Sequence, residues 1–234
     1  MIAYCNGCDK VVAVGEEAND TIILIKDTVT EQIDHELVFE PIFAETLPFD
    51  MQLTRSPFAL YLLYKEKRPF TEDEVRIYYI PSITASAIEI QSFEYMPSID
   101  YAWNLDSVMF VADNPAGSVA LLVKGTTADV GKYEIAQFEI TAAGAVSDHL
   151  NYVNSFELKS DQNTISGIAR ASSGQNVYAM AGWELDGNLF NLFHTIWDRD
   201  SGGLYENTKA KTIVVGNSVP SKVHIVFQED SVLV

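Results

Sequence analysis

The sequence predicts an all-β protein, and three observations support that class. Short runs of β-branched and aromatic residues alternate with clusters of Gly, Asn, Asp, Pro and Ser, which is the pattern of strands joined by turns. No segment repeats apolar residues at the three- and four-residue spacing of a long amphipathic helix. With 234 residues, 47% of them apolar, the chain can bury a full core. We therefore expect one all-β domain over residues 1–234.

Strand pairs recur along the chain. In each pair two apolar runs flank a polar loop, and the pairs lie at residues 10–26, 58–80, 107–124, 165–183 and 212–227. Third strands are expected at 36–43, 87–95, 133–141 and 189–197, and weaker fourth strands near 48–54, 99–104, 150–158 and 204–209. The groups begin near residues 11, 58, 108, 165 and 212, at steps of 47, 50, 57 and 47 residues. Four strands per unit at a period of roughly 40 to 50 residues is typical of β-propeller blades.

We therefore predict a single five-bladed β-propeller of four-stranded antiparallel blades. The predicted blades cover residues 11–54, 58–104, 107–158, 164–209, and 212–234 together with 1–5. The fifth unit lacks an outer strand, and residues 1–4 can supply it by pairing beside residues 231–234. This pairing would close the ring and hide the edges of an open sheet.

The stretch "YCNGCDK" at residues 4–10 contains both cysteines of the chain, Cys5 and Cys8. Asn-Gly between them is a strong turn signal. A zinc site needs four ligands, and no paired histidines complete a set, because the four occur singly at His35, His149, His194 and His224. We predict a link between the closing blade and the first blade, with reduced or loosely paired thiols and no metal or other cofactor. So few cysteines favour a reducing compartment.

The charge of the chain excludes some partners. Lys and Arg number 15 against 33 Asp and Glu, for a net charge of −18, so the surface repels phosphate backbones and we expect no nucleic acid partner. The densest basic cluster, at residues 65–68, is interrupted by Glu66 and predicts a solvated loop. The longest apolar runs are far shorter than a membrane span, and the N-terminus lacks a secretory signal. We expect a cytoplasmic or particle-associated protein.

The stretch "TIWDRDSGGLYENT" at residues 195–208 resembles the end of a WD-repeat blade. In that family Trp-Asp closes the third strand before a Gly turn, and here Trp197 and Asp198 hold the dipeptide and Gly202 with Gly203 the turn. The resemblance covers one unit of five, because the other units replace the dipeptide with "PIF", "EYM" and "EIT". It implies the propeller architecture and not membership of the family.

Metal and catalytic motifs are weak. Asp198, Asp200 and Gly202 alternate as in a Ca²⁺ loop, but Lys209 stands where the loop requires a bidentate Glu. Some five-bladed propellers hydrolyse glycosides with paired channel carboxylates. Candidates for such a pair are Glu16, Glu17, Asp106 and Asp113. "WNLD" at 103–106 only faintly resembles the nucleophile motif of those hydrolases. We predict that the chain is not an enzyme and rank a glycoside hydrolase last.

Large aromatic residues are the candidate binding residues. Five of them lie near strand ends, where propeller loops form pockets: Tyr101, Trp103, Trp183, Trp197 and Tyr205. Exposed aromatics there could anchor a protein or stack on a sugar, whereas buried ones would pack between blades. No aromatic signature repeats five times, as a multivalent lectin would require. The sequence therefore favours an interaction or structural subunit of a larger assembly, such as a virion, over a carbohydrate-binding propeller.

Overall fold

The computed structural model describes residues 1–5, 7–42, 47–54, 58–66, 74–95, 108–111, 119–124, 132–138, 153–157, 163–170, 177–186, 189–198, 203–208, 226–228 and 231–233. Within these ranges every regular element is a β-strand and every strand pair is antiparallel. The prediction of an all-β protein is confirmed.

The strands form sheets from consecutive segments of the chain. The first sheet holds β1 (Ile2–Cys5), β2 (Lys10–Glu17), β3 (Asp20–Asp27) and β4 (Ile33–Phe39). The second holds β5 (Asp50–Leu53), β6 (Leu60–Glu66), β7 (Glu74–Ile80) and β8 (Gln91–Tyr95). The third holds β9 (Val108–Val111), β10 (Val119–Lys124), β11 (Lys132–Phe138) and β12 (Val153–Glu157). The fourth holds β13 (Asn163–Arg170), β14 (Val177–Asp186), β15 (Leu189–Asp198) and β16 (Gly203–Thr208), and β17 (Val226–Gln228) pairs with β18 (Ser231–Leu233).

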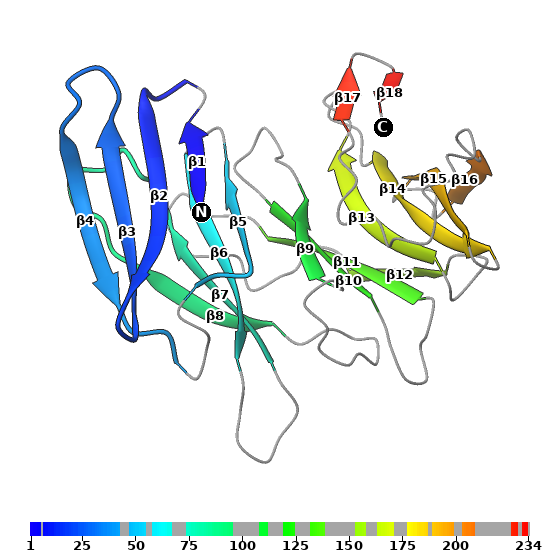
Figure 1. Cartoon of the computed structure of the whole chain (residues 1–234), viewed down its shortest axis with the longest axis horizontal. Coiled ribbons are helices and arrows are strands. Elements are labelled where there is room, and N and C mark those ends of the chain that lie inside the picture. The colour runs from blue at the N-terminus through cyan, green and yellow to red at the C-terminus, as the bar shows by residue number, and fades with distance from the viewer. Residues whose placement is uncertain are drawn as a thin grey trace.

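The sheets meet through their first strands. Strand β1 contacts β5, β5 contacts β9, β9 contacts β13, and β13 contacts β17. Figure 1 shows the sheets following one another from β1–β4 to β17–β18. Four-stranded meanders that touch through their first strands suggest propeller blades. The number of blades stays a prediction.

The predicted grouping of strands is wrong for the first two units. The strand expected at 48–54 as the last of the first blade is β5, the first strand of the second sheet. The strand pairs at 10–26 and 58–80 are the middle pairs β2–β3 and β6–β7 of their sheets. The grouping failed because β1 and β5 are only four residues long and carry a weaker strand pattern than the pairs that follow them.

The predicted pairing of the two termini is also wrong. Strand β1 pairs with β2, with Ile2 opposite Ala13 and Cys5 opposite Lys10, while β18 pairs with β17 (Figure 1). Cys5 and Cys8 therefore lie where β1 and β2 join within the first sheet, and not in a link between blades. Gly7 adopts a φ of 103°, a backbone conformation that favours glycine.

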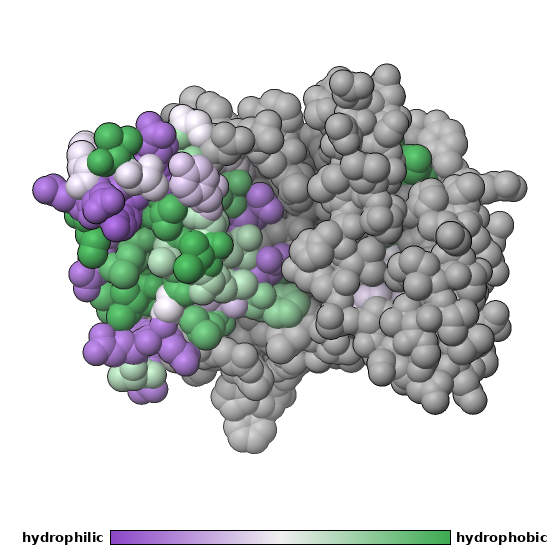
Figure 2. All heavy atoms as spheres, turned by 45° about the horizontal axis from the view of Figure 1, so that its top comes forward, coloured by the Kyte–Doolittle hydropathy of each residue, from purple (hydrophilic) through white to green (hydrophobic). Residues whose placement is uncertain are grey.

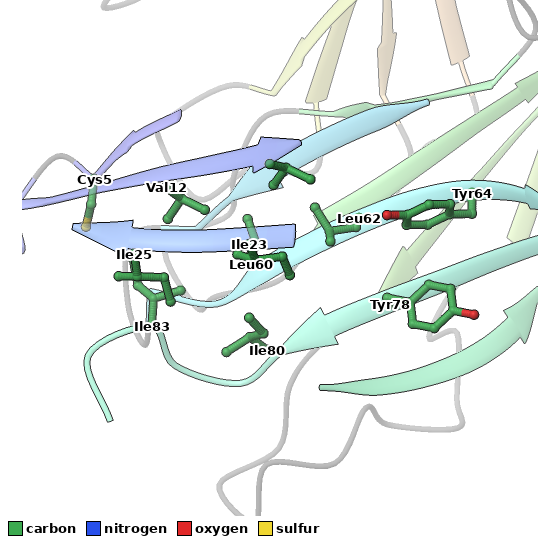
Figure 3. Close-up of a cluster of buried hydrophobic side chains, with 11 residues drawn as sticks. Cys5, Val12, Ile23, Ile25, Leu60, Leu62, Tyr64, Tyr78, Ile80 and Ile83 are labelled. Atoms are coloured by element: carbon green, nitrogen blue, oxygen red, sulfur yellow. The ribbon is translucent and has the colours of Figure 1, made fainter. Parts of the chain in front are cut away.

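The main described core lies between the first and second sheets. From the first sheet it includes the buried side chains of Val12, Val14, Ile23 and Ile25, and from the second those of Leu60, Leu62, Tyr64, Tyr78 and Ile80. Figure 3 shows these side chains converging from the two sheets, with Cys5 and Ile83 at one end. Alternate residues of each strand reach this core, as the two-residue repeat of a strand requires.

The second sheet is buried on both faces. Five successive residues of β6, Leu60 to Tyr64, are each at most 1% exposed, and residues 77–80 of β7 are buried as well. Because successive residues of a strand point to opposite faces, both faces of this sheet are covered. Tyr61 and Tyr79 stack on the face away from the first sheet, with ring centroids 6.2 Å apart.

Candidate interaction surface

The first sheet has one covered face and one uncovered face, which we name the open face. Cross-strand pairs define it, because residues directly opposite each other in antiparallel strands point to the same side. One row runs Ile2–Ala13–Leu24–Glu36, a second runs Gly15–Ile22–Val38, and a third holds Tyr4, Val11, Lys26 and Ile33. Each of the four strands therefore places apolar side chains on the open face.

Large side chains of the open face are exposed to solvent. Ile2 is 78% exposed, Tyr4 64%, Val38 55% and Ile33 54%. A Cβ atom added at Gly15 would meet no other atom within 4 Å. Figure 2 shows this hydrophobic area over the described residues of the first sheet, with hydrophilic residues around it. Exposed apolar patches of this kind commonly mark interaction sites.

Acidic groups flank the apolar rows. Glu17 lies opposite Asp20 across β2 and β3 at one end of the open face, and Glu36 ends the row that begins at Ile2. Lys26 is the one cation among the cross-strand rows that define this face. Residues 1–42 as a whole contain nine Asp and Glu against two Lys. The surroundings of the open face are therefore strongly acidic.

The covered face of the first sheet is fixed to the second sheet by a buried hydrogen bond. Thr21 Oγ1 and Tyr64 OH lie 2.9 Å apart, and either can be the donor. Burial raises the pKa of the Tyr64 hydroxyl above its usual value, although the Thr21 hydrogen bond acts in the opposite direction. Phe39 of β4 also packs against the rings of Tyr78 and Tyr64 in the second sheet, at 4.9 and 6.2 Å between centroids. Polar and aromatic contacts thus set the position of the first sheet.

A cation joins three strands at the other end of the covered face. Lys10 Nζ donates to Asp27 Oδ2 at 2.7 Å and also forms an ion pair with Asp34. The hydrogen bond from Lys10, together with backbone N–H groups of Thr30 and Val29, holds the pKa of Asp27 well below its usual range. Lys10 lies on the covered face and is already paired with two carboxylates, so it adds no positive charge to the open face.

Cys5 and Cys8 form a disulfide across the β1–β2 loop. This pairing corrects the prediction of reduced or loosely paired thiols, and it removes the cysteine-based reason to expect a reducing compartment. Cys5 is buried at the edge of the main core, and Cys8 packs against that core. The disulfide therefore fixes the hairpin that carries Ile2 and Tyr4.

The structure does not gather the predicted aromatic residues at one place. Trp183 is half-buried in β14 and pairs with Leu192 of β15. Trp197 lies five positions further along β15, or about 16 Å at the usual rise per residue. Tyr205 pairs with Ile196, next to Trp197. Trp197 and Tyr205 are thus at neighbouring register positions, and Trp183 is apart from them.

Several other sequence candidates lie outside the described residues, namely Tyr101, Trp103, Asp106, Asp113, Asp200, Gly202 and Lys209. Glu16 and Glu17 are exposed at the end of β2, and Asp198 ends β15. Across the described ranges, no group of three or more His, Cys, Asp and Glu could hold a metal ion. The same described residues contain no helix that is long and apolar enough to cross a membrane.

Comparison with known proteins places the chain beside solved structures only. No family matches the sequence, and no curated protein matches it. A functionally unknown protein from Desulfotomaculum acetoxidans DSM 771 has a similar structure, with a TM-score of 0.51 and 17% identity over 99% of this chain. The chain spans 61% of that protein's length. This likeness shows a shared fold and no function.

A second similar structure is the GH43 endo-arabinanase from Bacillus licheniformis. It has a TM-score of 0.36 and 11% identity, covering 88% of this chain and 75% of the arabinanase. That named activity contradicts the prediction that the chain is not an enzyme, and we do not retain that prediction. At this TM-score the likeness assigns neither a reaction nor catalytic residues to the chain.

The open face was missed by reasoning from the sequence. Strands β2 and β3 read "KVVAVG" and "TIILIK", apolar at successive positions, which usually indicates burial on both faces. The pattern identifies both faces as apolar but does not reveal which one a neighbouring sheet covers. Only the stacking of the second sheet on Val12 and Ile23, and not on Ala13 and Leu24, distinguishes them.

Proposed function

We propose that this protein is an interaction subunit that docks a protein partner on the open face of β1–β4. One observation carries the proposal: all four strands place apolar side chains on the open face, and Ile2, Tyr4 and Val38 among them are exposed. Covering large aliphatic and aromatic side chains stabilises a complex by roughly 1.5 to 3 kcal/mol for each one fully buried. A few such anchors commonly supply most of the energy of an interface.

The geometry of the sheet supports docking over an accidental exposure of single residues. Ile2 and Val38 lie in adjacent cross-strand rows, with Ala13, Leu24 and Ile22 between them. The backbone that carries these side chains is already ordered by the hydrogen bonds between the strands. Binding of a partner would therefore cost little backbone entropy. Tyr4 adds an aromatic ring with a polar tip, a residue type common at interfaces.

Copurification from the native source tests this proposal. The full chain carries a tag and is compared with the Ile2→Asp/Val38→Asp double variant and with Val29→Asp. Val29 is 75% exposed but lies in the β3–β4 turn. This control therefore replaces an exposed valine outside the open face with aspartate. All three proteins should melt alike, because the substituted side chains are exposed.

We expect the double variant to lose the partner, because truncation of a central anchor commonly costs about 2 kcal/mol or more, which is about thirtyfold in affinity. The Val29→Asp control should retain the partner. The proposal is wrong if the double variant folds and still retains the partner captured by the unaltered chain, or if that chain captures none.

A further inference from the structure

We infer that the partner at the open face is another polypeptide that presents an apolar β-sheet face with a basic rim. This inference rests on the proposed function and names the chemistry of the partner. It joins two observations, the shape of the open face and the sign of the charges that surround it.

The shape favours a sheet as the occupant. The open face is the surface of four hydrogen-bonded strands, with small or branched side chains at Val11, Ala13 and Ile22. The covered face of the same strands already packs against a sheet, because Val12 and Ile23 there contact the cluster that holds Leu60 and Leu62 of the second sheet. Two sheets stack face to face about 10 Å apart with their side chains interdigitated. A second sheet can therefore cover the full width of the open face.

The charges favour a basic partner and disfavour a second copy of this chain. Glu17, Asp20 and Glu36 lie on the cross-strand rows of the open face, against Lys26. Two copies placed face to face would bring their acidic rims together, and each chain carries a net charge of −18. Like charges across an interface oppose association, whereas Lys or Arg on the partner would attract and orient it.

A pair of synthetic hairpins provides the probe. Both peptides share one Asn-Gly turn and one Val-bearing face, and they differ only at the strand ends of that face, which are Lys in one and Glu in the other. Binding to the full chain is measured by fluorescence anisotropy at low and at high salt. We expect the Lys hairpin to bind at least about tenfold more tightly than the Glu hairpin, and salt to reduce the difference.

Variants separate docking on the open face from attraction to an acidic protein. Ile2→Asp/Val38→Asp adds negative charge, so general attraction would strengthen Lys-hairpin binding, whereas docking on the open face predicts a loss of about tenfold or more. Glu36→Lys should weaken binding, and Glu31→Lys, which makes the same charge change in the β3–β4 turn, should not.

The outcomes distinguish this inference from the proposed function. If both hairpins bind equally and Ile2→Asp/Val38→Asp removes both, the open face docks partners without selecting charge, and the inference alone is wrong. A dimer of the unaltered chain that the double variant abolishes would identify a second copy as the occupant and overturn it. Lys-hairpin binding that survives the double variant, or no binding of either hairpin, also overturns it. Copurification remains a separate test of the proposed function.

Discussion

The first and second sheets have the same strand order and similar apolar sequences, but they differ in what covers them. The second sheet lies between neighbours, so that Leu62 and Leu63, which point to opposite faces, are both buried. The first sheet buries Val12 and Ile23 against the second sheet and leaves Ile2 and Val38 on the other side exposed. An apolar sheet face therefore becomes a core or a surface according to its position in the stack.

The largest expected effect contrasts two leucines. Leu63→Ala in the second sheet should lower the free energy of unfolding by about 2 to 5 kcal/mol, because it opens a cavity in a covered face. Leu24→Ala on the open face should cost well under half of that, because its side chain is only half-buried. Urea denaturation of both variants measures the difference. Equal losses would show that the open face is covered in solution.

The disulfide gives the next largest effect. Cys5→Ala/Cys8→Ala should cost about 2 kcal/mol, the value for cross-linking so short a loop. The same loss should follow when the unaltered chain is reduced with dithiothreitol, and the double variant should not respond to reductant. Thermal melting with and without reductant measures both effects. A reductant-sensitive double variant would show that the effect does not arise from this disulfide.

The hydrogen bond between the two sheets should contribute about 1 kcal/mol. Thr21→Val and Tyr64→Phe each remove it, and a double-mutant cycle isolates its energy. Tyr64 also carries a pH signature. Its pKa is raised in the folded protein, so above pH about 10 the unfolded chain loses this proton first and stability falls as the pH rises. The alkaline loss of stability should be smaller in Tyr64→Phe, and identical pH profiles would contradict this assignment.

The smallest expected effect is a gain. Gly15→Ala should stabilise the protein by roughly 0.5 to 1 kcal/mol, because alanine loses less backbone freedom on folding and the added Cβ meets open space. Gly7→Ala is the matched control and should destabilise the protein, because the φ of Gly7 is 103°. Chemical denaturation of both variants is sufficient. A destabilised Gly15→Ala protein would indicate that another group packs on the open face.

The sequence predicted strands better than it predicted their partners. The apolar pairs at 10–26 and 58–80 are strands, since period-two and β-branched patterns are local signals. Their place within a sheet depends on short neighbours such as β1 and β5, whose four residues carry little signal. The disulfide was missed because cysteine spacing alone does not reveal the redox state. A role in a virion and the use of the aromatic residues at 101–205 stay predictions.

The consecutive order of the strands has a consequence for synthesis of the chain. All hydrogen bonds between β1, β2, β3 and β4 join residues that have been made by Phe39, so the first sheet can form while the rest is still being translated. The face of the first sheet that will be buried in the core stays uncovered until β6 and β7, which end at Ile80, have been synthesised. During that interval both of its apolar faces meet water, a state prone to aggregation. Repulsion between the nine carboxylates of residues 1–42 on neighbouring chains then opposes self-association until a partner binds.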